Sequence, residues 1–261
     1  MKLAFSTLPF MNFDAERLRI IAEKYGIDAV EVRTLKDNSF PHGKGLVISN
    51  LGSGITIKNY DEKQMEEAAQ IFEAAHKTDI PAVRIFLGNF ARRWDEPRQE
   101  LDYEGIVRAV RELAKLELAQ VWIETHNEFA TGKSLRKLLD DINHPHVKVI
   151  WDIIHPIEDE ELPQETVDLL QDDIVHVHIK DGIKHPDSMM HDYYYTRLGE
   201  GELPIVEIMK ILSERGYSGY FSLEWENIWR AELWNSYPTG EDAVEAFVKY
   251  MKMLEVDMRQ C

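Results

Sequence analysis

The sequence predicts a single closed (β/α)8 barrel. About eight apolar runs alternate with amphipathic helical stretches, the runs are continuously apolar, and no glycine-rich phosphate loop is present. Continuous apolar runs are typical of parallel strands covered on both faces, and parallel strand pairs require connecting helices. An open, doubly wound sheet is the alternative, but eight similar units without a phosphate loop favour closure.

The expected strands follow the apolar runs in order along the chain. They cover residues 3–6, 27–32, 46–51, 82–87, 120–124, 147–152, 174–180 and 220–224. Residues 34–45 carry Asn, Ser, Pro and two Gly, so we expect a loop there in place of a full helix.

The expected helices are amphipathic stretches with capping signals. Asp14 is an N-cap residue and Gly26 a stop signal for a helix over residues 15–25, and Asp61 caps a helix that runs to residue 77. Pro163 opens a later helix, where Glu165 is favourable in the first turn. The other helices are expected over residues 102–116, 134–142, 203–214 and 242–254.

Length and composition are compatible with one large core. The chain has 261 residues, of which 44% are hydrophobic, and barrels of this class commonly run to about 250 residues as one domain. No stretch rich in Pro, Gly or Ser divides the chain. We therefore expect residues 1–261 to form a single domain.

Charge and cysteine content exclude several classes of protein. The formal net charge of −17 disfavours binding to nucleic acid or to an anionic membrane. The single cysteine, Cys261, permits no disulfide within one chain. The first residues are too polar for a signal peptide, and no apolar run approaches the roughly 18 residues of a membrane span. These observations predict a cytoplasmic protein with neither nucleic acid nor membrane as a partner.

Four consecutive expected strands end at or near a metal-binding side chain. These side chains are Glu124, Asp152, His178 and Glu224. The C-terminal strand ends of a barrel meet at the rim that holds the active site. A single acid at a strand end is more often exposed or paired with a lysine, but four such residues without a cation would repel one another or shift their pKa values. The sequence therefore predicts one divalent ion, because this ligand set suits Mn²⁺, Mg²⁺, Co²⁺ or Zn²⁺.

Longer motifs surround these strand ends. Residues 26–32 read Gly-Ile-Asp-Ala-Val-Glu-Val, 151–155 read Trp-Asp-Ile-Ile-His, 176–181 read His-Val-His-Ile-Lys-Asp, and 216–224 read Gly-Tyr-Ser-Gly-Tyr-Phe-Ser-Leu-Glu. Together they resemble the sugar phosphate isomerase/epimerase superfamily, the xylose isomerase-like TIM barrels, which includes ketose 3-epimerases, hydroxypyruvate isomerases, inosose dehydratases and endonuclease IV. The resemblance covers most of the chain and is strongest from Val121 onward.

The resemblance implies roles for individual residues. The metal ligands of the family correspond to Glu124, Asp152, His178 and Glu224, the same four residues. In the epimerases the two glutamates also move protons, one on each face of the substrate, and these correspond to Glu124 and Glu224. His155 corresponds to a substrate-binding histidine that would stabilise an enediolate oxygen.

Further residues are candidates for substrate binding. Lys180 shares the inward side of its strand with His178, and the ketose epimerases carry an arginine where this chain has Lys184. His126, Trp225 and Glu226 follow strand ends and complete the set of candidates. The alternative role for Lys180 is an ion pair with a carboxylate of the site. The alternative for His126 and Glu226 is that they are simply polar loop residues.

Some polar residues in expected strands have no clear place in this scheme. Glu31 and Arg33 share a face, for which a structural ion pair is favoured over a substrate contact, and Arg84 faces the same choice. His176 is equally compatible with a core position and a site role. Five arginines are candidates for a substrate phosphate: Arg33, Arg92, Arg93, Arg197 and Arg230.

The aromatic residues after the last strand allow two interpretations. Trp225, Trp229, Trp234 and Tyr237 would either stack on a sugar face or form a lid, or they would form a hydrophobic latch or a dimer surface. A homo-oligomer is compatible with the second interpretation.

These features predict a metal-dependent isomerase or epimerase of a small sugar, keto-sugar, sugar phosphate or polyol, which transfers protons through an enediolate. A dehydratase of an inosose or dehydroshikimate-type substrate is the alternative. A phosphodiesterase similar to endonuclease IV and a non-catalytic binding protein fit less well, because the charge disfavours DNA and the four ligands are intact.

Overall fold

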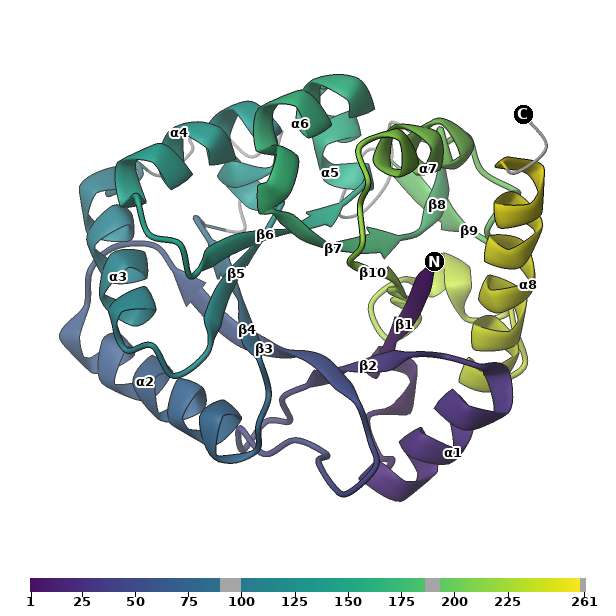
Figure 1. The fold of residues 1–261 in the computed structure, drawn as a ribbon, viewed down its shortest axis with the longest axis horizontal. Coiled ribbons are helices and arrows are strands. Elements are labelled where there is room, and N and C mark those ends of the chain that lie inside the picture. The colour runs from purple at the N-terminus through teal and green to yellow at the C-terminus, as the bar shows by residue number, and fades with distance from the viewer. Residues whose placement is uncertain (90–99, 186–192, 259–261) are drawn as a thin grey trace.

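The computed structural model describes residues 1–89, 100–185 and 193–258, with side chains as far as residue 256. Its main sheet is a closed barrel with the strand order β1-β10-β7-β6-β5-β4-β3-β2, and neighbouring strands are parallel. Figure 1 looks along the barrel and shows the strands as an inner ring surrounded by helices. The predicted (β/α)8 barrel is therefore confirmed, and the open sheet is excluded.

The barrel strands match the expected runs closely. They are β1 (Lys2–Ser6), β2 (Ala29–Arg33), β3 (Ile48–Ile57), β4 (Ala82–Leu87), β5 (Gln120–Glu124), β6 (Val147–Asp152), β7 (Ile174–Ile179) and β10 (Tyr220–Leu223). The largest difference is β3, which was expected over residues 46–51. It continues past Gly52 and Gly54 because the pairing with β4 shifts register between Gly52 and Thr56, as at a bulge.

Helices connect the barrel strands, except between β2 and β3, where the sequence predicted a loop. They are α1 (Ala15–Tyr25), α2 (Glu62–Lys77), α3 (Tyr103–Lys115), α4 (Gly132–Ile142), α5 (Ile154–Glu158), α6 (Pro163–Leu170), α7 (Ile205–Glu214) and α8 (Gly240–Met258). Asp14 and Asp61 accept the backbone N–H groups of Arg17 and Gln64, and Gly26 ends α1 at φ 69°. No helix forms within residues 34–45.

Two kinds of interior follow from the alternation of side chains along each strand. Residues such as Phe5, Leu51 and Ile85 are fully buried in the apolar core, where each large side chain contributes roughly 1.5–3 kcal/mol by leaving water. Polar residues are also buried, among them Glu31, Arg84, His176, His178 and Lys180. Because unpaired buried charges are costly, these residues must satisfy one another or a ligand.

An antiparallel hairpin, β8 (Asp181–Lys184) with β9 (Tyr193–Thr196), follows β7. The sequence predicted no strand between residues 180 and 220, so this pair was missed. The Asp181 carboxylate anchors its base by accepting the backbone N–H groups of Gly182, Gly199, Gly201 and Leu203. This network explains why aspartate follows Lys180 in the motif.

None of the helices in the described part of the chain is both long and apolar enough to cross a membrane.

Candidate metal centre

The four predicted ligands converge at one end of the barrel. The strands β5, β6, β7 and β10 are consecutive around the ring (Figure 1), and the register places Asp152 beside His178. One ligand atom from each of Glu124, Asp152, His178 and Glu224 lies within 4.8 Å of the others, and all four side chains are buried. Residues separated by as many as 100 positions in sequence therefore form one compact cluster.

The imidazole of His178 faces this cluster with Nδ1. That nitrogen lies 3.3 Å from Glu224 Oε2, 3.8 Å from Glu124 Oε1 and 3.9 Å from Asp152 Oδ2. It makes no hydrogen bond with any residue that the structure describes. Three carboxylates converge on this buried ring nitrogen, and such a set of one nitrogen and three oxygen donors fits a divalent cation.

Lys180 brings a positive charge into the same cluster. Its Nζ lies 2.6 Å from Asp152 Oδ2, 2.7 Å from Glu224 Oε2 and 2.5 Å from Glu226 Oε1, and its side chain is buried. Two of the substrate-binding candidates, Lys180 and Glu226, thus lie directly beside the proposed ligands.

Two arginines flank the two glutamates. Arg84 Nη1 lies 2.7 Å from Glu124 Oε2, and Arg33 Nη1 lies 3.5 Å from Glu224 Oε1. The Arg84 guanidinium also lies over the ring of Phe86, with Cζ 3.9 Å from the ring centroid, a favourable cation–π arrangement. Each glutamate therefore has its own arginine partner, on the side of the barrel formed by β2 and β4.

The three carboxylates differ in their electrostatic surroundings. Burial raises the pKa of Glu124, with Arg84 opposing the increase and Glu224 adding to it. For Glu224, burial alone would raise the pKa, but Lys180, His178 and Arg33 outweigh it and hold the pKa well below its usual value. Lys180 and His155 likewise overcome burial and lower the pKa of Asp152. In the absence of an ion, Glu124 is thus the carboxylate of the three that most readily accepts a proton.

The two histidines of the site have pKa values shifted upward. Burial would lower the pKa of His178, but the carboxylates of Glu224, Glu31 and Glu124 raise it well above the usual value. Burial likewise opposes the shift at His155, where Asp152 and Glu158 raise the pKa. Both rings therefore favour the protonated form when no ion is bound.

His155 lies in α5, directly after β6. Its Nδ1 is 3.0 Å from Glu158 Oε2, and its Nε2 is 3.5 Å from Asp152 Oδ2. The ring of His126 packs edge-on against it, with centroids 4.4 Å apart. The short helix thus orients the His155 ring beside a proposed ligand, and His126 is part of the same group.

Two substrate-binding candidates remain, Lys184 and Trp225. Lys184 is exposed on β8, and no contact between it and the four ligands is found among the described residues. Trp225 is buried and packs edge-on against Tyr237, whereas Trp229 and Trp234 are exposed. The packing of Trp225 on Tyr237 is typical of a hydrophobic latch.

The arginines considered for a phosphate have different positions. Arg230 is buried over the ring of Tyr195, with Cζ 3.8 Å from its centroid, and Arg197 binds the backbone carbonyl of Ser236. Arg33 contacts Glu224. Arg92 and Arg93 lie outside the described residues.

The structure corrects the expectation that Glu31 and Arg33 form an ion pair. Within the described residues, Arg33 pairs with Glu224, and Glu31 Oε2 instead contacts Nε2 of both His176 and His178. An acid at the centre of the apolar run Ala-Val-Glu-Val was a signal of this buried role, but its partners lie about 145 residues away in the sequence. His176 thereby joins the network around His178.

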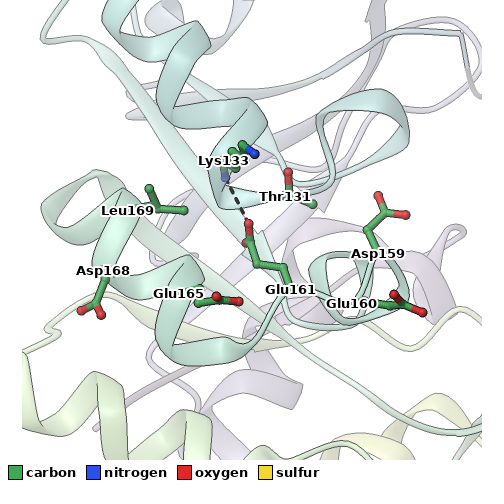
Figure 2. A pocket seen from close by; sticks show the side chains of 8 residues that line it. All are labelled: Thr131, Lys133, Asp159, Glu160, Glu161, Glu165, Asp168 and Leu169. Carbon is green, nitrogen blue, oxygen red and sulfur yellow. Dashed lines mark hydrogen bonds between the residues drawn. The ribbon is translucent and has the colours of Figure 1, made fainter.

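A second acidic region lies apart from this cluster, beside α4 and α6. Figure 2 shows Asp159, Glu160, Glu161, Glu165 and Asp168 around a surface pocket. Glu161 accepts the backbone N–H groups of Gly132 and Lys133 at the start of α4, where a negative charge stabilises the helix. The acid at the centre of this pocket therefore has a structural explanation.

Comparisons with known proteins agree with this architecture. The model of a family described as "Xylose isomerase-like TIM barrel" matches residues 5–252. An uncharacterised protein of Methanocaldococcus jannaschii is 32% identical over 60% of this chain and 54% of its own length. Fructoselysine 3-epimerase of Escherichia coli O157:H7 is 24% identical over 62% of this chain and 54% of its own length. The matches thus span about half the length of these two relatives.

A third relative and two solved structures match more of the chain. The 3-dehydroshikimate dehydratase of Bacillus anthracis is 27% identical over 81% of this chain and 80% of its own length. D-psicose 3-epimerase of Clostridium cellulolyticum H10, solved with D-tagatose, has a TM-score of 0.74 at 18% identity and 99% coverage of both chains. The IolI protein with a bound zinc atom has a TM-score of 0.72 at 19% identity, with 99% of this chain and 98% of that chain covered. The structural likenesses concern the fold.

Proposed function

The chain belongs to the xylose isomerase-like TIM barrel family, and we propose that it is a metal-dependent isomerase or epimerase of a small sugar, keto-sugar or related polyol. Glu124, Asp152, His178 and Glu224 would hold one divalent ion of the Mn²⁺, Mg²⁺, Co²⁺ or Zn²⁺ type. The ion would polarise a substrate carbonyl and make the neighbouring C–H group more acidic.

One observation carries this proposal. Three carboxylate oxygens converge on Nδ1 of His178 in a buried cluster at the C-terminal rim of the barrel, where barrels of this class hold their active sites. The family members with named activities include epimerases and a dehydratase, all compatible with proton transfer beside a carbonyl group.

The two glutamates are proposed to transfer the proton. A base must be ionised and an acid protonated for a proton to leave one face of a carbon atom and return on the other. Glu124 and Glu224 come from strands on opposite sides of β6 and β7 in the ring, so they approach the substrate from two directions. His155, oriented by Glu158, would donate a hydrogen bond to the oxygen that becomes negative in the enediolate.

A dehydratase is the second candidate, favoured by two observations. The match to 3-dehydroshikimate dehydratase covers four-fifths of both chains. Lys180 also places an ammonium group between Asp152, Glu224 and Glu226, where it would protonate a departing hydroxyl. Both candidates begin with the same proton abstraction and differ in the step after it.

Proton exchange with solvent tests the step that the two candidates share. The Mn²⁺-loaded protein would be incubated in D₂O with a panel of ketoses, inososes and 3-dehydroshikimate. A second sample, from which the ion has been removed, would be treated in the same way. We expect a C–H group beside the carbonyl to exchange for deuterium, and removal of the ion with EDTA to abolish the exchange.

The products then distinguish the candidates. A ketose or its epimer that differs from the substrate in mass only by the deuterium taken up indicates isomerisation, whereas the loss of one water and a new conjugated absorbance indicate dehydration. Exchange that continues at the same rate after complete removal of the ion would refute the metal-dependent mechanism.

A further inference from the structure

Glu31 is a buried acid that the proposed chemistry does not use. It lies in the middle of β2, its side chain is fully buried, and it belongs to none of the motif positions assigned to catalysis or metal binding. An ionised carboxylate in this position is costly unless it is paired, so its partners indicate why the sequence contains it.

Those partners are two histidines on β7. Glu31 Oε2 lies 2.8 Å from His178 Nε2 and 3.1 Å from His176 Nε2, and all three side chains are 0% exposed. The carboxylate is therefore an acceptor for the N–H groups of both rings.

We propose that Glu31 is the positioning residue of the metal centre, because it accepts the Nε2–H of His178 and leaves Nδ1 as the nitrogen that binds the ion. This inference rests on the proposed function, since it assumes that an ion occupies the centre. Glu31 touches neither substrate nor ion and acts through His178.

The chemistry of imidazole explains why this contact matters. A neutral ring carries one proton, and the hydrogen bond made by one nitrogen determines which nitrogen keeps its lone pair. An acceptor beside Nε2 holds the proton there, so Nδ1 faces Glu124, Asp152 and Glu224 as a donor atom. A carboxylate acceptor also makes the ring more basic and fixes its orientation.

Two neighbouring residues hold Glu31 in place. His176 donates to the same oxygen as His178, so the carboxylate is held from two points on β7. Gly52 leaves the space that the carboxylate and Arg33 occupy, because a Cβ atom there would lie 3.2 Å from Glu31 Oε1 and 2.7 Å from Arg33 Cδ. The position of Glu31 is thus built into three strands.

The same three residues allow one competing interpretation. Glu31, His176 and His178 offer donor atoms within 4.8 Å of one another, so they could form a second ion site that shares His178. That arrangement would require Nε2 of His178 to lose its proton to a metal ion, whereas the proposal keeps the proton on Nε2.

Metal titration of three proteins distinguishes a positioning role of Glu31 from a second ion site. Wild type, Glu31→Gln and His176→Gln would be stripped with EDTA and titrated calorimetrically with Mn²⁺. We expect wild type to bind one ion and Glu31→Gln to bind it about 10–100-fold more weakly. His176→Gln, which removes one of the two contacts that hold the Glu31 carboxylate, should also bind one ion, with an affinity between those two. Glutamine keeps the size of Glu31 and can accept one N–H, so the substitution should disturb the fold little. Thermal unfolding of the ion-free variants checks that they are folded.

Nitrogen NMR of the zinc-loaded wild type provides a test that needs no variant. With ¹⁵N-labelled histidine, the ring of His178 should carry its proton on Nε2 and none on Nδ1. Two ions per chain, a proton on Nδ1, or unchanged affinity in Glu31→Gln would each overturn the inference. Absence of any ion in wild type would overturn the proposed function along with it.

Discussion

Arg84 and Glu124 form a salt bridge inside the barrel, with Nη1 2.7 Å from Oε2 and the two side chains 0% and 2% exposed. Neither group can turn to water if the other is lost. Burial lowers the pKa of Arg84, and nearby Arg33 adds to this effect, so the guanidinium depends on the surrounding carboxylates for its charge. The pair therefore connects the stability of the barrel to the protonation of a proposed catalytic residue.

We expect Arg84→Met to destabilise the protein by about 3–5 kcal/mol, because it leaves the Glu124 carboxylate buried without its partner. Urea unfolding of the ion-free protein measures this change. Arg108→Met is the matched control, since the exposed pair of Arg108 with Glu112 should contribute no more than about 1 kcal/mol. The double variant Arg84→Met/Glu124→Gln should regain part of the loss, and an equal loss in the double and single variants would contradict this explanation.

Glu224→Gln should lower the rate of substrate deuterium exchange by about 10²–10⁴-fold, the usual contribution of a general acid or base. Because Glu224 is also a proposed ligand, the rate must be measured at saturating Mn²⁺, with the affinity determined separately. Glu207→Gln, an exposed change on α7, is the control and should retain the wild-type rate. If exchange in Glu224→Gln persists at the wild-type rate, Glu224 does not transfer the proton.

The affinity for the metal ion should fall as the pH is lowered. The pKa of His178 is raised by Glu224, Glu31 and Glu124 against the effect of burial, so below that pKa the ring is protonated and must release one proton to bind an ion. Asp152 and Glu224, whose pKa values are lowered, remain ionised and release none, whereas Glu124, whose pKa burial raises, releases a second proton at pH values low enough to protonate it. The affinity should therefore decrease about tenfold per pH unit below the His178 pKa, more steeply once Glu124 is protonated as well, and become constant above the His178 pKa.

Calorimetry in buffers of different ionisation enthalpy counts the protons released on binding. About one proton per ion is expected near pH 6. The same affinity at about pH 6 and about pH 8, with no proton released, would show that His178 is already neutral or does not bind the ion.

The apolar runs and strand-end residues made much of this architecture predictable from sequence. Parallel strands have to be apolar on both faces, so the runs were recognisable without knowledge of their partners. The convergence of Glu124, Asp152, His178 and Glu224 followed from placing each at a strand end, because a closed barrel brings those ends together.

Features that depend on distant partners were not predictable in this way. The hairpin of β8 and β9 depends on Asp181, whose hydrogen bonds reach Gly199, Gly201 and Leu203 across the turn. Glu31 was assigned to Arg33 because two residues of the same parity lie on the same side of a strand. Its true partners come from β7, and local spacing contains no information on which oppositely charged groups meet inside the barrel.

The Asp181 network predicts that Gly201→Ala destabilises the protein by about 1–3 kcal/mol through overpacking. A Cβ atom at position 201 would lie 2.1 Å from Asp181 Oδ1 and 2.5 Å from the nitrogen of Gly182. Gly54→Ala is the matched control, because a Cβ there meets nothing within 4 Å. Thermal unfolding of both variants checks the difference. Equal melting temperatures would show that the residues around Asp181 can move to accept the Cβ atom without loss of stability.

The four proposed ligands occupy one continuous arc of the barrel wall, from β5 through β6 and β7 to β10. The opposite arc contributes Glu31, Arg33 and Arg84, which contact the proposed ligands, but none of the four ligands themselves. These three residues lie within strands β2 and β4, so the loops after β1 to β4 carry none of the four proposed ligands. Directed evolution for a new substrate should therefore begin with the loops after β1 to β4, where changes in length leave the ion in place.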